Sequence, residues 1–340
     1  MTLATRLARS LIALVLLTLA TALVPSPAHA ADNGAWSVTP TPADSSSPTP
    51  RSYFVLEGAP GTTLTDKVRI RNFTKKPLTF SIYGADGYNT EQGGFFALRG
   101  LDQPQTDVGA WIKVPVQTVK VVGRTQVDVP ITIQIPANAT PGDHVGGLVA
   151  LNGSVEGTTE SGGIDVGIKR AVASRLYLRV AGPTMPALKV TDVELEHDRG
   201  IFPWSGEGKG TVSYTVKNTG NLRLSPAATI TLTGLFGRDL SSVETGQIVD
   251  LLPGATVKLT EEVTGVGAVD RITTKVTMAT PEGTTDSEST TQWVVPWVLT
   301  VLTILLVIGA TWWWLRRRAA KRKAFAAVSS APKITIAAGR

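Results

Sequence analysis

Apolar and polar residues alternate with a period of two along most of the chain between residues 51 and 151. Because successive side chains of a strand point to opposite faces, this pattern predicts strands with one face in a core and the other in water. Residues 145–151 and 166–180 complete the set, separated by a polar loop at 156–163. The alternating apolar positions are Val68 and Ile70; Leu78, Phe80 and Ile82; and Val127, Val129, Ile131, Ile133 and Ile135. No segment before residue 293 has a convincing helical period.

A second set of alternating runs follows a Gly- and Pro-containing hinge at residues 181–187. Its inward-facing positions are Val193 and Leu195; Val212, Tyr214 and Val216; Ile230 and Leu232; Val257 and Leu259; and Ile272, Val276 and Met278. Residues 67–82 and 211–232 share a strand, an Asn-centred turn and a second strand, which indicates an internal repeat.

These patterns predict an all-β fold with two tandem immunoglobulin-like antiparallel β-sandwich domains, followed by one transmembrane helix. We place the first domain at residues 31–182 and the second at 183–279. A stretch rich in Pro, Ser and Thr at 39–50 is expected to be a flexible loop within the first domain, and residues 280–292 a polar spacer.

The predicted membrane-spanning helix lies at residues 293–315, since residues 294–315 carry no charged side chain and would span a bilayer core of roughly 30 Å as a helix. Tryptophans mark both of its expected interfaces, and a basic cluster follows it. The anchor residues are Trp293, Trp297, Trp312, Trp313, Trp314, Arg316, Arg317 and Arg318. By the positive-inside rule, the short tail 316–340 lies in the cytoplasm and the rest of the chain outside a plasma membrane that it crosses once.

The first thirty residues read as a secretory signal peptide, with Arg6 and Arg9 before an apolar run at 11–24. The sequence Ala28-His29-Ala30 is a cleavage site, so we expect cleavage after Ala30. The alternative is a signal anchor that stays attached, but the apolar run is short for a span.

The formal net charge of +6 reflects membrane topology. Residues 1–30 and 316–340 hold ten of the 33 basic residues and no acidic ones, so the external part has 23 basic and 27 acidic residues. The basic balance therefore gives no support for a nucleic-acid partner. Cysteine is absent, so no disulfide contributes to the stability of the cores.

Catalytic chemistry finds no support in the external sequence, and we predict that the protein is not an enzyme. Only His144 and His197 follow the predicted cleavage site, no thiol is present, and no G-x-S-x-G motif occurs. We therefore predict no catalytic residues, no metal site and no cofactor. The acidic alternation of Asp192, Glu194 and Glu196 is typical of a solvated strand face.

Binding surfaces are better supported. Aromatic and amide side chains gather in a Gly-rich stretch at 83–96, and two further aromatics lie between Gly and Pro residues at 198–210. Such rings could stack on sugars or contact a partner. The candidate ligand-binding residues are Tyr83, Tyr88, Asn89, Gln92, Phe95, Phe96, Phe202 and Trp204. The alternative for Phe95, Phe96 and Trp111 is that they cap the core.

Three segments resemble the WxL-interacting protein family of Gram-positive bacteria: YFVLEGAPGTTLTDKVRIRNFTKKPLTFSIYGADG at 53–87, VDVPITIQIPANATPGDHVGGLVAL at 127–151 and VSYTVKNTGN at 212–221. They are similar to its N-terminal peptidoglycan-binding domain and to the second Ig-like domain after it, in the style of actinobacterial members. The resemblance implies a non-enzymatic cell-surface protein, with an adhesion or scaffold role, that contacts peptidoglycan or another cell-wall polymer and a surface-protein partner.

Two other functions stay open at this stage. A membrane-tethered assembly chaperone would use an open sandwich edge to bind exported subunits, since the first sandwich also loosely resembles pilus-chaperone architecture. An envelope hydrolase is the least supported, because the sequence offers no catalytic constellation.

Overall fold

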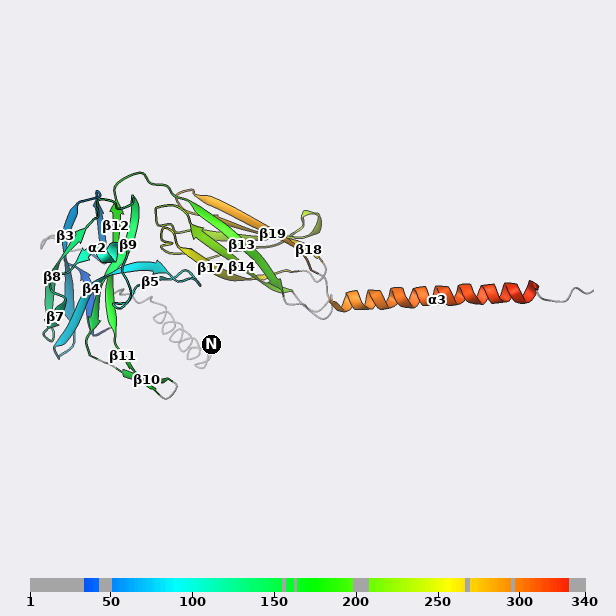
Figure 1. Cartoon of the computed structure of the whole chain (residues 1–340), viewed down its shortest axis with the longest axis horizontal. Helices are drawn as coiled ribbons and strands as arrows, with labels where there is room; N and C mark the ends of the chain where they lie inside the picture. Colours follow the sequence, from blue (N-terminus) through cyan, green and yellow to red (C-terminus); the bar gives the residue numbers. More distant parts are fainter. Residues whose placement is uncertain are drawn as a thin grey trace, which may run out of the picture. The chain divides into compact units, whose positions relative to one another are not determined.

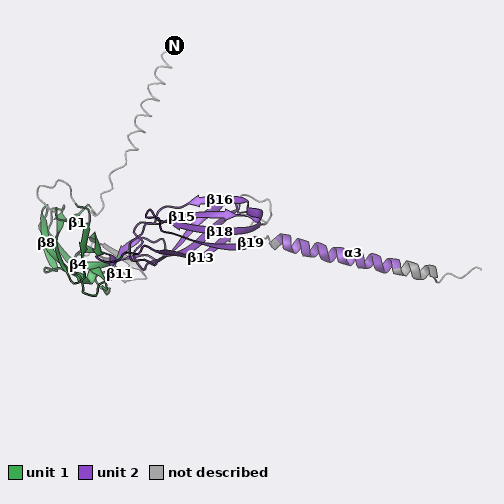
Figure 2. Ribbon diagram, turned by 90° about the horizontal axis from the view of Figure 1, so that it is seen from above, with its two compact units in different colours: residues 1–86, 98–140, 145–180 green, residues 87–97, 141–144, 181–340 purple. Residues whose placement is uncertain are grey.

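The structure is a computed structural model that describes residues 34–42, 51–154, 157–161, 164–197, 208–266, 270–294 and 297–329. These residues are mostly strands (Figure 1), which confirms the all-β prediction. They form two compact units that are not continuous in sequence (Figure 2). Unit 1 takes residues up to 86, 98–140 and 145–180, and unit 2 takes 87–97, 141–144 and the chain from 181 onward.

One sheet of unit 1 has the order β1-β3-β8-β6, with all neighbours antiparallel. Its strands are β1 (Trp36–Pro40), β3 (Thr63–Asn72), β8 (Gln126–Gln134) and β6 (Ile112–Lys113). The β3 and β8 strands carry the predicted alternation, and Val68, Ile70 and Ile131 are buried.

The second sheet has the order β2-β12-β9-β4-β5, with β7 paired to β4. Its strands are β2 (Phe54–Gly58), β12 (Ala171–Val180), β9 (Gly142–Asn152), β4 (Leu78–Asn89), β5 (Phe96–Leu98) and β7 (Thr118–Val121). β2 runs parallel to β12, which differs from the purely antiparallel prediction. Strand direction is set by the long-range path of the chain, and the alternation of side chains is the same in both arrangements.

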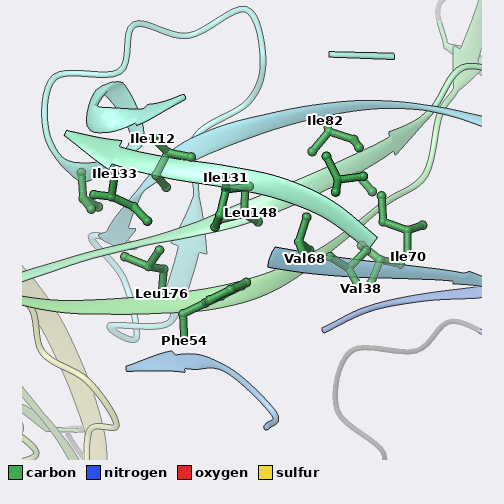
Figure 3. Packing of buried hydrophobic residues seen from close by; sticks show 14 of the residues in the cluster. Val38, Phe54, Val68, Ile70, Ile82, Ile112, Ile131, Ile133, Leu148 and Leu176 are labelled. Carbon is green, nitrogen blue, oxygen red and sulfur yellow. The ribbon is translucent and has the colours of Figure 1, made fainter. Parts of the chain in front are cut away.

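The core of unit 1 lies between the inward faces of its two sheets, as the close view of Figure 3 shows. Phe54 and Leu176 come from β2 and β12, and Ile131 and Ile133 from β8 on the opposite sheet. The Trp36 ring lies 5.4 Å from that of Phe80, measured between centroids. Each such side chain stabilises the fold by about 1.5–3 kcal/mol through burial.

Two local predictions for this unit are wrong. The polar segment expected to be a loop contains the hairpin of β10 (Gly157–Ser161) and β11 (Ile164–Ile168), and the run expected at 166–180 is divided between β11 and β12.

A short helix, α2 (Val108–Trp111), follows the loop after β5. Four residues are too few to establish a helical period, so the sequence pattern could not reveal it.

Unit 2 is a sandwich of a three-stranded sheet, β13-β14-β17, and a four-stranded sheet, β16-β15-β18-β19. The strands are β13 (Leu188–His197), β14 (Lys209–Asn218), β17 (Thr256–Thr264), β16 (Asp239–Glu244), β15 (Ala227–Thr233), β18 (Asp270–Ala279) and β19 (Thr285–Val294). Tyr214, Ile230 and Val276 belong to its core.

The polar spacer predicted at 280–292 is largely β19, which pairs with β18 along its whole length. Threonine and serine make up half of this strand, and its side chains are mainly exposed because it lies at the edge of the sheet. A strand solvated in this way lacks the apolar alternation by which a half-buried strand is recognised. Its side chains still fasten it: Asp286 Oδ2 accepts the Val190 N–H at 2.8 Å, and Gln292 Nε2 donates to Leu195 O at 2.7 Å.

The internal repeat appears as two matching asparagine corners. Asn72 and Asn218 are both fully buried. In each, Nδ2 donates to the carbonyl four residues on, Lys76 O at 2.8 Å or Leu222 O at 2.7 Å. Each amide also donates to a more distant carbonyl: Asn72 to Val121 O at 3.1 Å and Asn218 to Leu251 O at 2.9 Å. The Oδ1 atom of each asparagine accepts the backbone N–H two residues later in the chain. Both units thus turn their chain with the same local chemistry.

A pH effect is expected from Tyr214, because burial raises the pKa of its phenol to about 12, helped by the charge of Glu261. The neutral phenol is favoured in the folded state, so the stabilisation is present below pH 10 and is lost as the pH rises towards 12. We expect unit 2 to lose about 2 kcal/mol over this range. Urea unfolding of the full chain between pH 9 and 12 would test this, and Tyr214→Phe should flatten the curve; equal slopes for the two proteins would contradict it.

Candidate functional site

A groove of about 560 Å³ lies on unit 1, between the start of β4 and the segment that runs from residue 101 to 118. Its apolar floor includes Ile82 and Ile112, and a polar set surrounds it. The residues that give this groove its hydrogen-bonding chemistry are Ser81, Tyr83, Gln105, Lys113, Gln117 and Thr118. On one side the backbone is fixed, because the Ile82 N–H donates to Gln117 O at 2.8 Å and Ser81 pairs with Thr118.

The opposite wall is held by one buried carboxylate. Asp86 is 3% exposed and accepts three backbone N–H groups. Its Oδ2 accepts those of Thr106 at 2.5 Å and Asp107 at 3.0 Å, and its Oδ1 accepts that of Gly109 at 2.6 Å. The last of these lies in α2, so the carboxylate fastens both the loop and the short helix to β4.

Gln105 continues the same fastening. Its Oε1 accepts the Asp86 N–H at 2.6 Å, and its Nε2 donates to the carbonyls of Gly100 and Gln103, each at 3.1 Å. Close approach of the two backbones requires glycine at Gly109, where an added Cβ would lie 2.5 Å from the Asp86 nitrogen. The groove wall is therefore a preorganised structure.

Tyr83 lies on β4, half-buried, with its side chain lining the groove. Burial raises the pKa of its phenol, the charge of Asp102 adds to this, and a backbone hydrogen bond from Leu101 opposes it. The phenol is thus neutral at physiological pH and can donate or accept a hydrogen bond. Beside it, Lys113 Nζ donates to Ala110 O at 2.8 Å, which leaves further ammonium protons for a ligand.

The remaining candidates from the Gly-rich stretch belong to unit 2, so the structure does not bring them together with Tyr83 in one unit. Tyr88 and Phe95 are exposed, at 40% and 73%, and Phe96 is half-buried. Gln92 is exposed and forms a β-bridge with Lys258. Their role in binding stays a prediction.

Asn89 makes structural hydrogen bonds, and its expected role in ligand binding stays a prediction. Its amide is buried, and its Nδ2 donates to Gly94 O and Asp250 O, each at 3.0 Å. Its Oδ1 accepts the Leu252 N–H at 2.9 Å. Both ends of the side chain are therefore engaged by the backbone, and the tip of the β4–β5 hairpin is fastened within unit 2.

Phe202 and Trp204 lie outside the described residues, as does the predicted cleavage site at Ala30. Among the described residues, no group of three His, Asp or Glu side chains is arranged to hold a metal ion.

The helix α3 (Trp297–Ser329) contains the predicted anchor, and its segment Val298–Lys321 is long and apolar enough to cross a membrane. Arg316 and Arg317 each lie 4.0 Å over the rings of Trp312 and Trp313, and Arg318 lies 5.0 Å over that of Trp314. Trp297 begins this helix, whereas Trp293 belongs to β19. The helix thus begins four residues later than predicted at 293.

The sequence did not point to Asp86, Gln105 or Lys113 as parts of a site. The only signal available was the cluster of polar residues between 102 and 107, where a loop with two glutamines follows an acidic residue on a strand. Nothing in the sequence of these residues shows which strand the loop contacts.

Residues 36–151 match the family model described as "WxL Interacting Protein, peptidoglycan binding domain". The match covers less than half of the chain, includes every residue that lines the groove, and supports the resemblance found in the sequence. No curated protein matches the chain.

Solved structures with a partial likeness to this chain include the Pseudomonas aeruginosa CupB2 chaperone, at 13% identity over 70% of this chain and 96% of that one, with a TM-score of 0.30. The class 5 fimbriae chaperone CfaA has 13% identity over 76% and 99%, with a TM-score of 0.33. The E. coli chaperone DraB has 11% identity over 71% and 94%, with a TM-score of 0.27. These likenesses are too low to bear on function.

Proposed function

We propose that this protein is a non-enzymatic cell-envelope protein that α3 holds in the plasma membrane and that binds peptidoglycan through the groove of unit 1. The observation that carries the proposal is that the groove lies entirely within the segment that matches a peptidoglycan-binding family. The basic cluster at residues 316–318 supports an external placement of both units and a cytoplasmic tail, by the positive-inside rule.

The chemistry of the groove suits an amino-sugar polymer with short peptides. The amides of Gln105 and Gln117 and the hydroxyls of Ser81 and Thr118 can pair with sugar hydroxyls and acetamido groups. The Tyr83 ring offers an apolar face to a sugar ring, and Lys113 offers a cation to a carboxylate. A groove that mixes apolar and polar side chains suits a sugar polymer, whose rings have apolar faces and polar hydroxyls.

The test is retention of the full-length protein, in detergent, on purified insoluble peptidoglycan. Tyr83→Ala combined with Lys113→Ala should weaken binding by about tenfold or more, equivalent to about 1.4 kcal/mol. Tyr88→Ala is the matched control, because Tyr88 lies exposed on the same strand outside the groove. Equal retention of the unmodified protein, the double variant and Tyr88→Ala would show that the groove is not the binding site. No retention of the unmodified protein would refute peptidoglycan binding.

A surface-protein partner, which the resemblance also implies, stays a prediction. Tyr88 and Phe95 are the side chains that we expect such a partner to contact, because they are exposed on a hairpin tip that Asn89 fastens.

A further inference from the structure

A short turn of unit 2 exposes two large apolar side chains. It is the 3₁₀ turn η1 (Leu235–Gly237), between β15 and β16, in which Leu235 is 39% and Phe236 99% exposed. The backbone of Phe236 has a φ of 61°, in the left-handed region that an aromatic residue rarely adopts. This conformation is strained, and no contact of the phenyl ring within the described chain offsets the strain.

The turn is nevertheless firmly built. The buried carboxylate of Asp270 accepts the Leu235 N–H at 2.8 Å through Oδ1 and the Arg238 guanidinium at 2.7 Å through Oδ2. The Gly234 N–H donates to Arg238 O at 2.7 Å and closes the turn. An exposed aromatic on such a fixed support is typical of a contact surface.

The turn lies at the end of unit 2 from which the chain enters α3. Asp270 is paired with Val294, the last residue of β19, and α3 begins three residues later at Trp297. Three residues span at most about 10 Å, so this end of the sandwich is held close to the start of the apolar helix. The opposite end of β18, at Ala279, lies about 30 Å away along the strand.

The neighbouring side chains suit a bilayer interface. Trp293 is 66% exposed and pairs in register with Arg271, and Arg238 is largely exposed beside the turn. Tryptophan and arginine are typical of the headgroup region, and leucine and phenylalanine of the acyl boundary. Asp239 is the exposed acid next to the turn, and Arg238 and Arg271 are the exposed basic residues; the buried Asp270 pairs with Arg238, so these four charges balance.

We propose that Leu235 and Phe236 insert into the outer interface of the same bilayer that α3 crosses, with Arg238 and Arg271 contacting lipid phosphates. This inference rests on α3 as the membrane anchor of the proposed function, and it does not depend on peptidoglycan binding. The occupant of the apolar turn is lipid, because the chain connection keeps the turn near the membrane wherever α3 is inserted. A second attachment point would thus restrain unit 2 on the bilayer surface.

The absence of cysteine from the chain allows a clean test with single labelled cysteines. Phe236→Cys, Met185→Cys and Ile304→Cys would each carry the fluorophore NBD, in full-length protein reconstituted into vesicles of phosphatidylglycerol and phosphatidylethanolamine with doxyl-labelled lipid. Met185 is the matched control, because it is 65% exposed and precedes β13 at the end of unit 2 far from α3. Ile304 lies within α3 and reports on the anchor itself.

We expect doxyl lipid to quench the label at 236 several times more strongly than the label at 185, and to quench the label at 304 as well. Quenching at 304 with none at 236 would overturn the inference and leave the anchor intact, whereas no quenching at 304 would refute both. Because a label could itself favour insertion, unlabelled protein with Leu235→Ser and Phe236→Ser should show increased trypsin cleavage near Arg238 in vesicles. No change in that cleavage would also count against the inference.

Discussion

Replacement of Asp86 by alanine is expected to cost unit 1 about 3–5 kcal/mol of unfolding free energy, because three backbone N–H groups lose a charged acceptor. Gly109 N is buried with it, at 2.6 Å from the carboxylate, so water cannot readily take the place of that partner. Urea unfolding would measure the loss, and hydrogen exchange should show faster exchange at residues 106–109. The same variant should also lose binding to peptidoglycan, since the groove wall would no longer be fixed.

The control for this prediction is Asp128→Ala, in the same unit. Asp128 pairs with Arg69 at 2.7 Å, but the two side chains are 33% and 27% exposed, so solvent screens the pair. The loss of an ion pair of this kind is expected to cost less than about 1 kcal/mol. If the two variants were equally stable, Asp86 would not be the support that its contacts indicate.

Replacement of Asn218 by alanine is expected to destabilise unit 2 by about 3 kcal/mol, and Asn72→Ala should do the same to unit 1. In each case the alanine removes two hydrogen bonds donated to carbonyls and one accepted from an N–H, at a position that is fully buried. Unfolding followed by hydrogen exchange would assign each loss to its own unit. Asn138→Ala, at an exposed position, should change the stability by less than about 0.5 kcal/mol.

Substitution of Asn218 by aspartate tests the donor role of the side chain apart from its acceptor role. Aspartate keeps an acceptor for the Gly220 N–H but places a carboxylate oxygen against the carbonyls of Leu222 and Leu251. We expect it to destabilise the unit at least as much as alanine. A neutral effect of both substitutions would show that the corner contributes little to stability.

The strands were predictable where one face is buried and the other is solvated. Val68 and Ile70 on β3 and Phe80 and Ile82 on β4 are buried at the positions that the alternation predicts. The same criterion misses β19, because an edge strand of threonine and serine has no apolar face to detect. It also misses α2, which the Asp86 carboxylate, 23 residues before Gly109, holds in place.

The site was predictable only in part, for a related reason. Tyr83 could be selected because an aromatic residue in a Gly-rich stretch is conspicuous, and the structure places it in the groove. Asn89 was selected on the same grounds, but its partners Asp250 and Leu252 lie more than 160 residues later in the chain. Hydrogen bonds over such separations follow from the fold, and one sequence carries no local signal of them.

β19 ends three residues before α3 begins, so the connection between the sandwich and its anchor is very short. Tension carried along the backbone from residue 181 toward the membrane would reach the strands of unit 2 at Leu188, the start of β13, and leave them at Val294. The contacts of Asp286 with Val190 and of Gln292 with Leu195 show that β13 and β19 run side by side in the same direction, so these two points lie at opposite ends of the sandwich. The load would then act along the strands and across the hydrogen bonds between them, which lie perpendicular to the strands in antiparallel pairs. The ten-residue register of β18 and β19 would be sheared as a whole instead of opening one bond at a time, an arrangement suited to a tether under mechanical stress.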